Sequence, residues 1–448
     1  MRLKVLAALP AQGPLRAAAA TFQKSGEASL LREQFRAPDF LQFEPVFTAI
    51  PIGSGQIAEA ASFSSAEQAE LFVVESEIEV SHPAEVPEQV NGAKLYADPV
   101  VEPFITCGNT PPVGDTNHIA GLLDVPALRQ KQLTGDGVAI AIVDTGINLQ
   151  HLRAALGFMP RFDAQNSWSP RNVPHNPGAY PVGHGTMCAY DALIAAPQAT
   201  LVDIPVLRSQ SPGGAAISGT LGEALQAFSW LLSKRAVTFD PGGLGGYKAL
   251  VVNNSWGMYQ PSWDFPPGHP GRYADNPNHP FNLITGVLAR SGIDILFAAG
   301  NCGADCPDQR CQGRTANTIM GANSLPDVLT VAGCDRTGQR VGYSSQGPGI
   351  PGLHREKPDL TAYTHFLGSQ AFGAGTPDSG TSTACPVAAG VVAALRSSNR
   401  AAPAAVPPAN LFASLRAAAN QRPGSPPWNP DYGHGIINPL ATAQMMGL

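Results

Sequence analysis

The chain has 448 residues, of which 44% are hydrophobic and only 14% are charged. This length exceeds that of a typical single domain, and the apolar content can fill a large core, which excludes a disordered chain. The formal net charge of −6 comes with no long basic run, so a nucleic-acid partner is excluded. No apolar run reaches the roughly 20 residues that span a bilayer, so no membrane association is expected.

The first 105 residues are expected to form a small α+β domain. Its elements in chain order are expected to be a strand over 4–9, a helix over 14–24, strands over 40–50 and 70–80, a short helix over 83–92 and a strand over 93–104. The order β-α-β-β-α-β is that of a split, ferredoxin-like fold.

Residues 106–117 are rich in Gly, Pro, Asn and Asp and are expected to be a linker to a larger domain over 118–448. In that domain we expect strands over 138–144, 199–207, 249–257, 293–301 and 328–333, and helices over 220–236 and 282–292. Several of these strands are apolar throughout, which indicates a parallel sheet covered by helices on both faces. The Pro- and aromatic-rich segment 258–280 is expected to be a loop at the surface rim.

Three short motifs contain residue types that could perform chemistry. Asp144 ends the first strand of the large domain, where parallel sheets place their active sites. His184 stands between two glycines in GHGTMCA, which lets backbone and substrate approach the imidazole. Ser382 lies in SGTSTACP at the start of an Ala-rich helix, near free backbone N–H groups. Taken singly, each has a structural alternative: a turn or cap Asp, a structural His and an N-cap Ser.

The Asp…His…Ser order, with these flanking residues, resembles the subtilase family of subtilisin-like serine peptidases. Further segments resemble the family across 118–442, namely NNSWG (253–257), ILFAAGN (295–301), YSSQGP (343–348), KPDL (357–360) and YGHGIINPLATA (432–443). The resemblance implies an α/β fold: a subtilisin-like three-layer domain with a mostly parallel central sheet, preceded by the small α+β domain.

The resemblance also implies a serine endopeptidase that forms an acyl-enzyme with peptide or protein substrates. Ser382 would be the nucleophile, His184 the general base and Asp144 its orienting partner, and Asn301 would supply the side-chain amide of the oxyanion hole. Substrate-binding roles fall on Ser255, Trp256 and Gly257, which would pair with an extended peptide, and on Ala298, Ala299 and Gly300, which would line part of the primary specificity pocket. For these last three residues, tight packing in a buried strand is the alternative.

The N-terminal domain resembles family propeptides in length and element order. It is therefore expected to be an intramolecular inhibitor of a zymogen that processes itself, with the segment from Val100 to about Asn117 crossing the active site and containing the cut. A permanently attached accessory domain is the alternative. For the whole chain, the competing functions are a catalytically silent subtilase scaffold and a transpeptidase or macrocyclase on the same fold.

Seven cysteines leave an odd thiol. Cys188 and Cys385 are expected to be buried thiols beside the triad without a catalytic role. Four others, Cys302, Cys306, Cys311 and Cys334, are expected to include a disulfide, with free thiols as the alternative; zinc is disfavoured because no His accompanies them. No metal or cofactor is required by the triad chemistry, and a structural calcium is left unassigned. Pro10 interrupts the N-terminal apolar stretch, which favours a cytoplasmic protein over a secreted one, whereas a disulfide would fit secretion.

Overall fold

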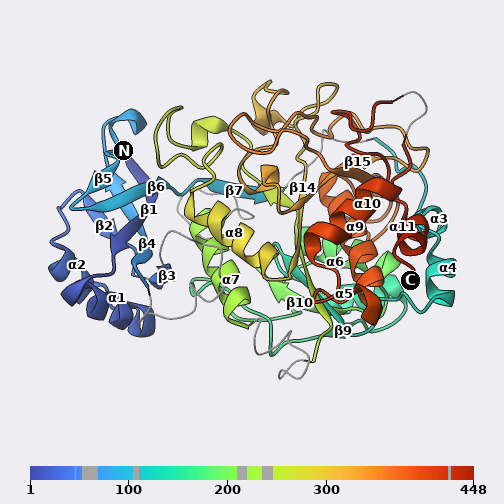
Figure 1. Ribbon diagram of the computed structural model, residues 1–448, viewed down its shortest axis with the longest axis horizontal. Helices are drawn as coiled ribbons and strands as arrows, with labels where there is room; N and C mark the ends of the chain where they lie inside the picture. Colours follow the sequence, from blue (N-terminus) through green and yellow to red (C-terminus); the bar gives the residue numbers. More distant parts are fainter. Residues whose placement is uncertain (46, 53–68, 104–109, 209–218, 235–245, 422–424) are drawn as a thin grey trace.

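The computed structural model describes residues 1–45, 47–52, 69–103, 110–208, 219–234, 246–421 and 425–448. Figure 1 shows a smaller N-terminal unit, drawn in blue, beside a larger body that contains the rest of the chain. In the described part of the chain, no helix combines the length and apolarity that crossing a membrane would need.

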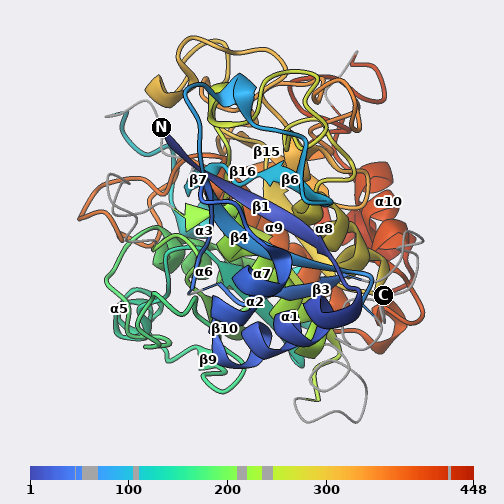
Figure 2. The same ribbon diagram turned by 90° about the vertical axis from the view of Figure 1, so that its left-hand side faces the viewer.

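The N-terminal unit is one antiparallel sheet with two helices. Its elements are β1 (Arg2–Pro10), α1 (Gly13–Ser25), α2 (Ser29–Phe35), β2 (Leu41–Phe43), β3 (Ile50–Ile52), β4 (Leu71–Glu79), β5 (Gln89–Val90) and β6 (Ala93–Ala97). The strand order is β2-β4-β1-β6-β5, with β3 also pairing with β4. Figure 2 looks onto this unit, with β1 crossing the sheet above α1 and α2.

Both faces of this sheet are buried, which explains why β1 is apolar at nearly every position. Val5, Ala7 and Leu9 belong to a core with residues of α1 and α2. The alternate residues, Leu6 and Ala8, belong to a second core that they share with the larger body. Because successive side chains of a strand point to opposite faces, β1 joins the two cores.

Several predicted elements of this unit are wrong in detail. The strand expected over 40–50 is split into β2 and β3, and α2 was not expected. The helix expected over 83–92 is only a single 3₁₀ turn, Pro83–Glu85, followed by β5, because Pro87 has no N–H to donate to a longer helix. The strand expected over 93–104 is divided at Pro99 into β6 and β7 (Val100–Pro103), and β7 leaves the sheet.

The larger body is built on a seven-stranded, fully parallel sheet, which confirms the predicted fold class. The strand order is β16-β15-β14-β12-β8-β10-β9. The strands are β8 (Val138–Val143), β9 (Arg161–Phe162), β10 (Thr200–Ile204), β12 (Ala249–Asn254), β14 (Asp294–Ala298), β15 (Leu329–Cys334) and β16 (Leu360–Tyr363).

Helices cover both faces of this sheet. They are α3 (Thr116–Leu122), α4 (Val125–Gln130), α5 (Leu149–Leu156), α6 (His184–Ala195), α7 (Leu221–Lys234), α8 (Pro280–Arg290), α9 (Thr381–Arg396), α10 (Pro408–Ala418) and α11 (Pro439–Met445). Alternate residues of β8 show the three layers: Ile140 and Ile142 pack in a core with α6 and α9, whereas Ala141 and Val143 pack in the core with α7 and α8.

Helices α6 and α9 lie against each other at close range because small residues meet there. A Cβ added at Gly390 of α9 would collide with the backbone carbonyl of Ala192 in α6. This close approach brings together the N-termini of the two helices, which contain His184 and Ser382. Small residues in both helices therefore position two of the predicted site residues.

Segment 258–280 is a loop, as expected, with a 3₁₀ turn at Pro261–Trp263, but it lies only partly at the surface: positions 262, 267–268, 270 and 277–278 are exposed and much of the rest is buried. Several of its aromatic residues are buried: Tyr273 and His279 are fully buried, and Phe265 lies in the core of the N-terminal unit. The Ala97 N–H donates to the Gly271 carbonyl at 2.8 Å. The Pro-rich composition is compatible with an exposed loop and with a loop that packs against another unit. In this structure the loop packs against the N-terminal sheet through Phe265.

Candidate active site

Asp144 lies at the carboxyl end of β8 and is fully buried. Its backbone is held from both sides, because its N–H donates to the Ile204 carbonyl at 3.0 Å and its carbonyl accepts from the Leu207 N–H at 2.9 Å. One carboxylate oxygen also accepts from the Thr145 N–H at 2.7 Å. These bonds fix the direction in which the carboxylate points.

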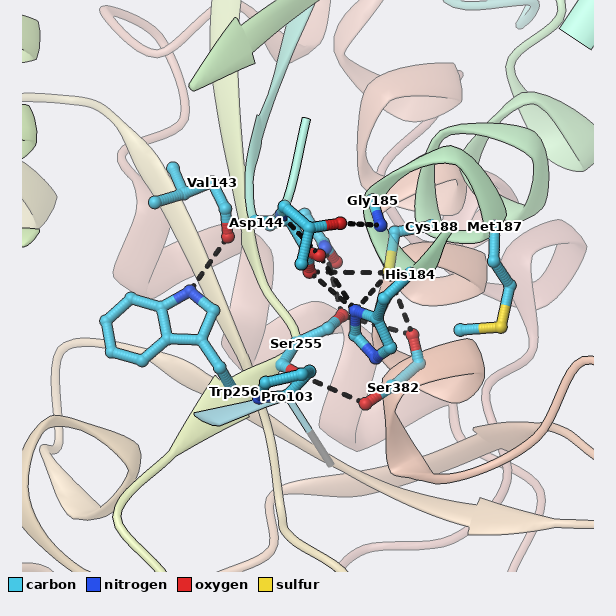
Figure 3. A network of polar contacts seen from close by, with 12 residues as sticks. Pro103, Val143, Asp144, His184, Gly185, Met187, Cys188, Ser255, Trp256 and Ser382 are labelled. Carbon is cyan, nitrogen blue, oxygen red and sulfur yellow. Dashed lines mark hydrogen bonds and ion pairs between the residues drawn. The ribbon is translucent and has the colours of Figure 1, made fainter. Parts of the chain in front are cut away.

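His184 is the first residue of α6, and its ring contacts this carboxylate. Nδ1 lies 2.8 Å from Asp144 Oδ1 and 2.9 Å from Oδ2, so Nδ1 bears the proton and donates to the carboxylate. Gly185 lets the helix start this close to the strand, because a Cβ there would lie 2.6 Å from the Gly146 carbonyl oxygen. Nε2 is buried and has no hydrogen-bond partner among the described residues, and in Figure 3 it faces the side chain of Ser382.

Ser382 is the second residue of α9, and two hydrogen bonds join it to Ser255. The Ser382 hydroxyl donates to the Ser255 carbonyl at 3.0 Å, and the Ser255 hydroxyl donates to the Ser382 carbonyl at 3.0 Å. The hydroxyl hydrogen of Ser382 is therefore directed to the Ser255 carbonyl in this structure. Rotation of the O–H group would redirect this hydrogen, and catalytic hydrogen bonds commonly tighten only when substrate binds.

Asn301 follows β14 and is oriented by Thr381, a residue to which the sequence interpretation gave no role. The Thr381 N–H and hydroxyl donate to Asn301 Oδ1 at 2.9 and 3.0 Å, and the same hydroxyl accepts from the Gly300 N–H at 3.0 Å. With its oxygen engaged in this way, the Asn301 amide presents its NH₂ group in the opposite direction. The motif SGTSTACP contains Thr381, so a residue-by-residue interpretation could have found it.

The strand β13 (Trp256–Gly257) pairs with a segment of the same chain. Trp256 is opposite Pro103 and Gly257 is opposite Glu102, in antiparallel register with β7. On its other edge β7 pairs with β11 (Gly219–Thr220), which gives a three-stranded sheet in the order β11-β7-β13. Residues of the N-terminal unit therefore lie where an extended peptide would add a strand to β13.

The three residues expected to line a specificity pocket are all buried at the end of β14. Ala299 packs with Ile319 and Ala332, and the Ala298 carbonyl accepts from the Asn323 side-chain amide at 2.9 Å. Gly300 has φ = 104°, a conformation that favours glycine. Their role in a pocket stays a prediction.

Cys188 also lies beside the His184 ring, but on the Nδ1 side. Its Sγ is 3.8 Å from Nδ1 and 3.7 Å from Asp144 Oδ2. Burial, reinforced by the Asp144 charge, raises the pKa of this thiol well above its ordinary value. A neutral thiol is a poor nucleophile, and Nδ1 already donates its proton to Asp144, so the arrangement does not fit a Cys–His pair.

The same three side chains are close enough together to be considered as a metal site. The nearest ligand atoms of Asp144, His184 and Cys188 lie within 4.8 Å of one another. A metal there would need a deprotonated thiol and a bare Nδ1. In this structure Nδ1 instead donates to the Asp144 carboxylate.

The cysteine group after Asn301 contains a disulfide between Cys302 and Cys311, which confirms the expectation of a disulfide in this group. Zinc binding is wrong for these two residues, because their sulfurs are bonded to each other. Cys334 and Cys385 are buried, and burial raises the pKa of Cys385.

Comparison with known sequences agrees with this geometry. Residues 135–435 match the profile of the subtilase family, Peptidase_S8. The chain belongs to the subtilase family. This subtilase is thus a member of a family of serine peptidases, as its motifs indicated.

Several characterised proteins resemble this subtilase. Serine protease AprX of Bacillus subtilis (strain 168) is 27% identical over 297 residues, which are 60% of this chain and 58% of AprX. Human membrane-bound transcription factor site-1 protease is 27% identical over 347 residues, 73% of this chain and 27% of that protein. The match thus spans little more than half of AprX and about a quarter of the human protein.

The fold resembles the crystal structure of fervidolysin from Fervidobacterium pennivorans. That likeness has a TM-score of 0.58 at 16% identity and covers 99% of this chain and 61% of fervidolysin. At this identity the likeness concerns the fold alone.

Proposed function

We propose that this subtilase is a serine endopeptidase that hydrolyses extended polypeptides with Ser382 as nucleophile, His184 as general base and Asp144 as its orienting partner. The observation that carries the proposal is the His184 ring, whose Nδ1 binds the buried Asp144 carboxylate while its unpaired Nε2 faces Ser382. A serine hydroxyl needs such a base within reach to attack a peptide carbonyl at neutral pH.

The chemistry would proceed in two halves. The Ser382 oxygen bonds to the scissile carbonyl carbon while its proton passes to His184 Nε2, and Asp144 stabilises the resulting imidazolium. The negative charge on the carbonyl oxygen is stabilised by the Asn301 amide and the Ser382 N–H. His184 then gives the proton to the leaving amine, and water, activated by the same imidazole, releases the acyl group and restores the serine.

We also propose that residues 1–105 act as an inhibitory propeptide, that 106–117 connect it and that 118–448 form the catalytic domain. The support is the position of β7, which fills the strand position beside β13 and so blocks a substrate. The predicted cut in the segment from Val100 to about Asn117 falls partly on residues 104–109, which lie outside the described residues.

The test compares the masses of the purified wild type and the Ser382→Ala variant and their labelling by a fluorophosphonate probe. We expect trimming near residues 105–117 and labelling in the wild type, and neither in Ser382→Ala. Loss of the nucleophile should lower kcat by about 10⁶-fold. Ser414→Ala is the matched control and should behave like the wild type, because this half-buried serine of α10 donates its hydroxyl to the Asn410 carbonyl of the same helix, away from the site. Equal intact masses together with absence of labelling in the wild type would contradict the proposal.

A further inference from the structure

Glu102 of β7 has a charged partner far away in the sequence. Its Oε2 accepts a hydrogen bond from Arg310 Nη1 at 2.6 Å, across 208 positions of sequence. The backbone of Glu102 stands opposite Gly257 in the strand position that a substrate would take. The flanking residues Val101 and Pro103 are buried, so the glutamate is the polar side chain of this stretch.

Arg310 is held in place by groups of the larger body. Asp308 accepts from Arg310 Nε at 2.9 Å and from Nη2 at 3.0 Å. The guanidinium lies over the Tyr259 ring, 3.9 Å from its centroid, and Nη2 also donates to the Tyr259 hydroxyl at 2.5 Å. Because these contacts leave Nη1 for Glu102, the arginine is oriented before any ligand arrives.

The same cluster also binds the backbone of the next residue. The Tyr259 hydroxyl donates to the Pro103 carbonyl at 3.1 Å. Arg310 and Tyr259 thus form two adjacent contacts, one with a carboxylate and one with the following carbonyl group. The loop that contains Arg310 is joined to the predicted oxyanion residue, because the Asp308 N–H donates to the Asn301 carbonyl at 2.9 Å and the Cys302–Cys311 disulfide closes the loop.

We propose that Arg310 is a specificity-determining residue, which selects substrates with an acidic side chain at the strand position that Glu102 occupies, between apolar neighbours. Tyr259 and Asp308 position it. The inference rests on the proposed function, since it names the substrate class of the same cleft. A glutamine at this position would keep the shape of the side chain but lose the charge-assisted bond to the guanidinium.

The test uses two internally quenched peptides that copy residues 98–112 and differ only in Glu or Gln at position 102. For the wild-type enzyme after self-processing, we expect kcat/KM to be about tenfold higher with Glu, the effect of one hydrogen bond between charged groups. Arg310→Gln should bring the ratio close to one, and Arg310→Lys should restore part of the preference. Arg314→Gln, four residues further along, is the matched control and should keep the full preference.

Two results would overturn the proposal: equal rates for both peptides in the wild type, or an unchanged preference in Arg310→Gln. If the enzyme neither cleaves any peptide nor reacts with a fluorophosphonate, the proposed function fails instead. The contact itself can still be tested in the full-length Ser382→Ala chain by urea unfolding of Glu102→Gln, Arg310→Gln and the double variant. The free energy of unfolding of the double variant should be no lower than that of the less stable single variant. If the losses in free energy of the two single variants add up in the double variant, the two residues do not interact.

Discussion

Glu75 and Asp98 of the N-terminal unit face Glu223 at the start of α7, and all three carboxyl groups are buried. One cation lies among them: Lys4 Nζ donates to Glu75 Oε1 at 2.8 Å. The Asp98 carboxylate caps α7 by accepting from the Gly222 N–H at 2.7 Å, and its other oxygen has no hydrogen-bond partner among the described residues. We expect the contact between the two units to weaken as the pH rises.

The magnitude follows from Glu223. Burial, with a further contribution from the Glu75 charge and against the Asn172 hydrogen bond, raises the Glu223 pKa from 4.5 to about 7. The docked state therefore holds the proton more tightly than a separated state in which Glu223 is solvated. The contribution of Glu223 to docking is strongest below pH 4.5, weakens between pH 4.5 and about 7, and is constant above that window. At about 1.4 kcal/mol per pKa unit, the loss is about 3 kcal/mol. Burial also raises the pKa of Asp98, so its effect has the same sign.

The perturbation is Glu223→Gln in the full-length Ser382→Ala chain, which cannot process itself. Hydrogen exchange of β1 and β4 at pH 5 and pH 8, corrected for intrinsic rates, gives the free energy of opening of the N-terminal sheet. In the parent this free energy should fall by roughly 2–3 kcal/mol between the two pH values, and in Glu223→Gln most of the fall should disappear. Exposed Glu356→Gln is the control. An equal fall in Glu223→Gln and the control would refute the reasoning.

Three further predictions concern single side chains. Cys188→Ala should keep near wild-type kcat/KM, because its thiol is neutral and lies on the Nδ1 side of His184; a loss as deep as that of Ser382→Ala would show that it is the nucleophile. Asn301→Ala should lower kcat by about 10²–10³-fold with little change in KM, and an unchanged kcat would remove it from the oxyanion hole. Arg396→Met should lower the free energy of unfolding by about 3–5 kcal/mol in urea titrations, because Asp294, 2.6 Å from Arg396, would be left as a buried unpaired charge. A change below 1 kcal/mol would show that Asp294 is neutral in the fold.

The parts of the molecule that the sequence predicted well are those in which a local pattern decides the structure. Strand β8 is apolar at every position because helices cover both of its faces, and this pattern is visible in VAIAIV without any partner. The motifs around Asp144, His184 and Ser382 occupy strand ends and helix starts, which glycine and small residues mark in the sequence.

The features that were missed depend on contacts between distant segments. The sequence around Arg310 does not indicate that Glu102 is its partner, because neither residue belongs to a recognisable motif. The segment 258–280 has the composition of an exposed loop, and its contact with the docked sheet, through Phe265 and His279, is not visible in that composition. The prediction of a helix over 83–92 was wrong for a local reason, because Pro87 lies in the middle of that span and interrupts a helix.

The insertion of Phe265 into the N-terminal core has a consequence for the order in which the chain can fold. The sheet that leaves the ribosome first must wait for Phe265, which lies 168 positions after the end of β6 at Ala97, before its hydrophobic interior is complete. Until then its second face, with Leu6 and Ala8, is also bare. Each half of the molecule thus completes the other, and separating them after synthesis exposes apolar surface on both.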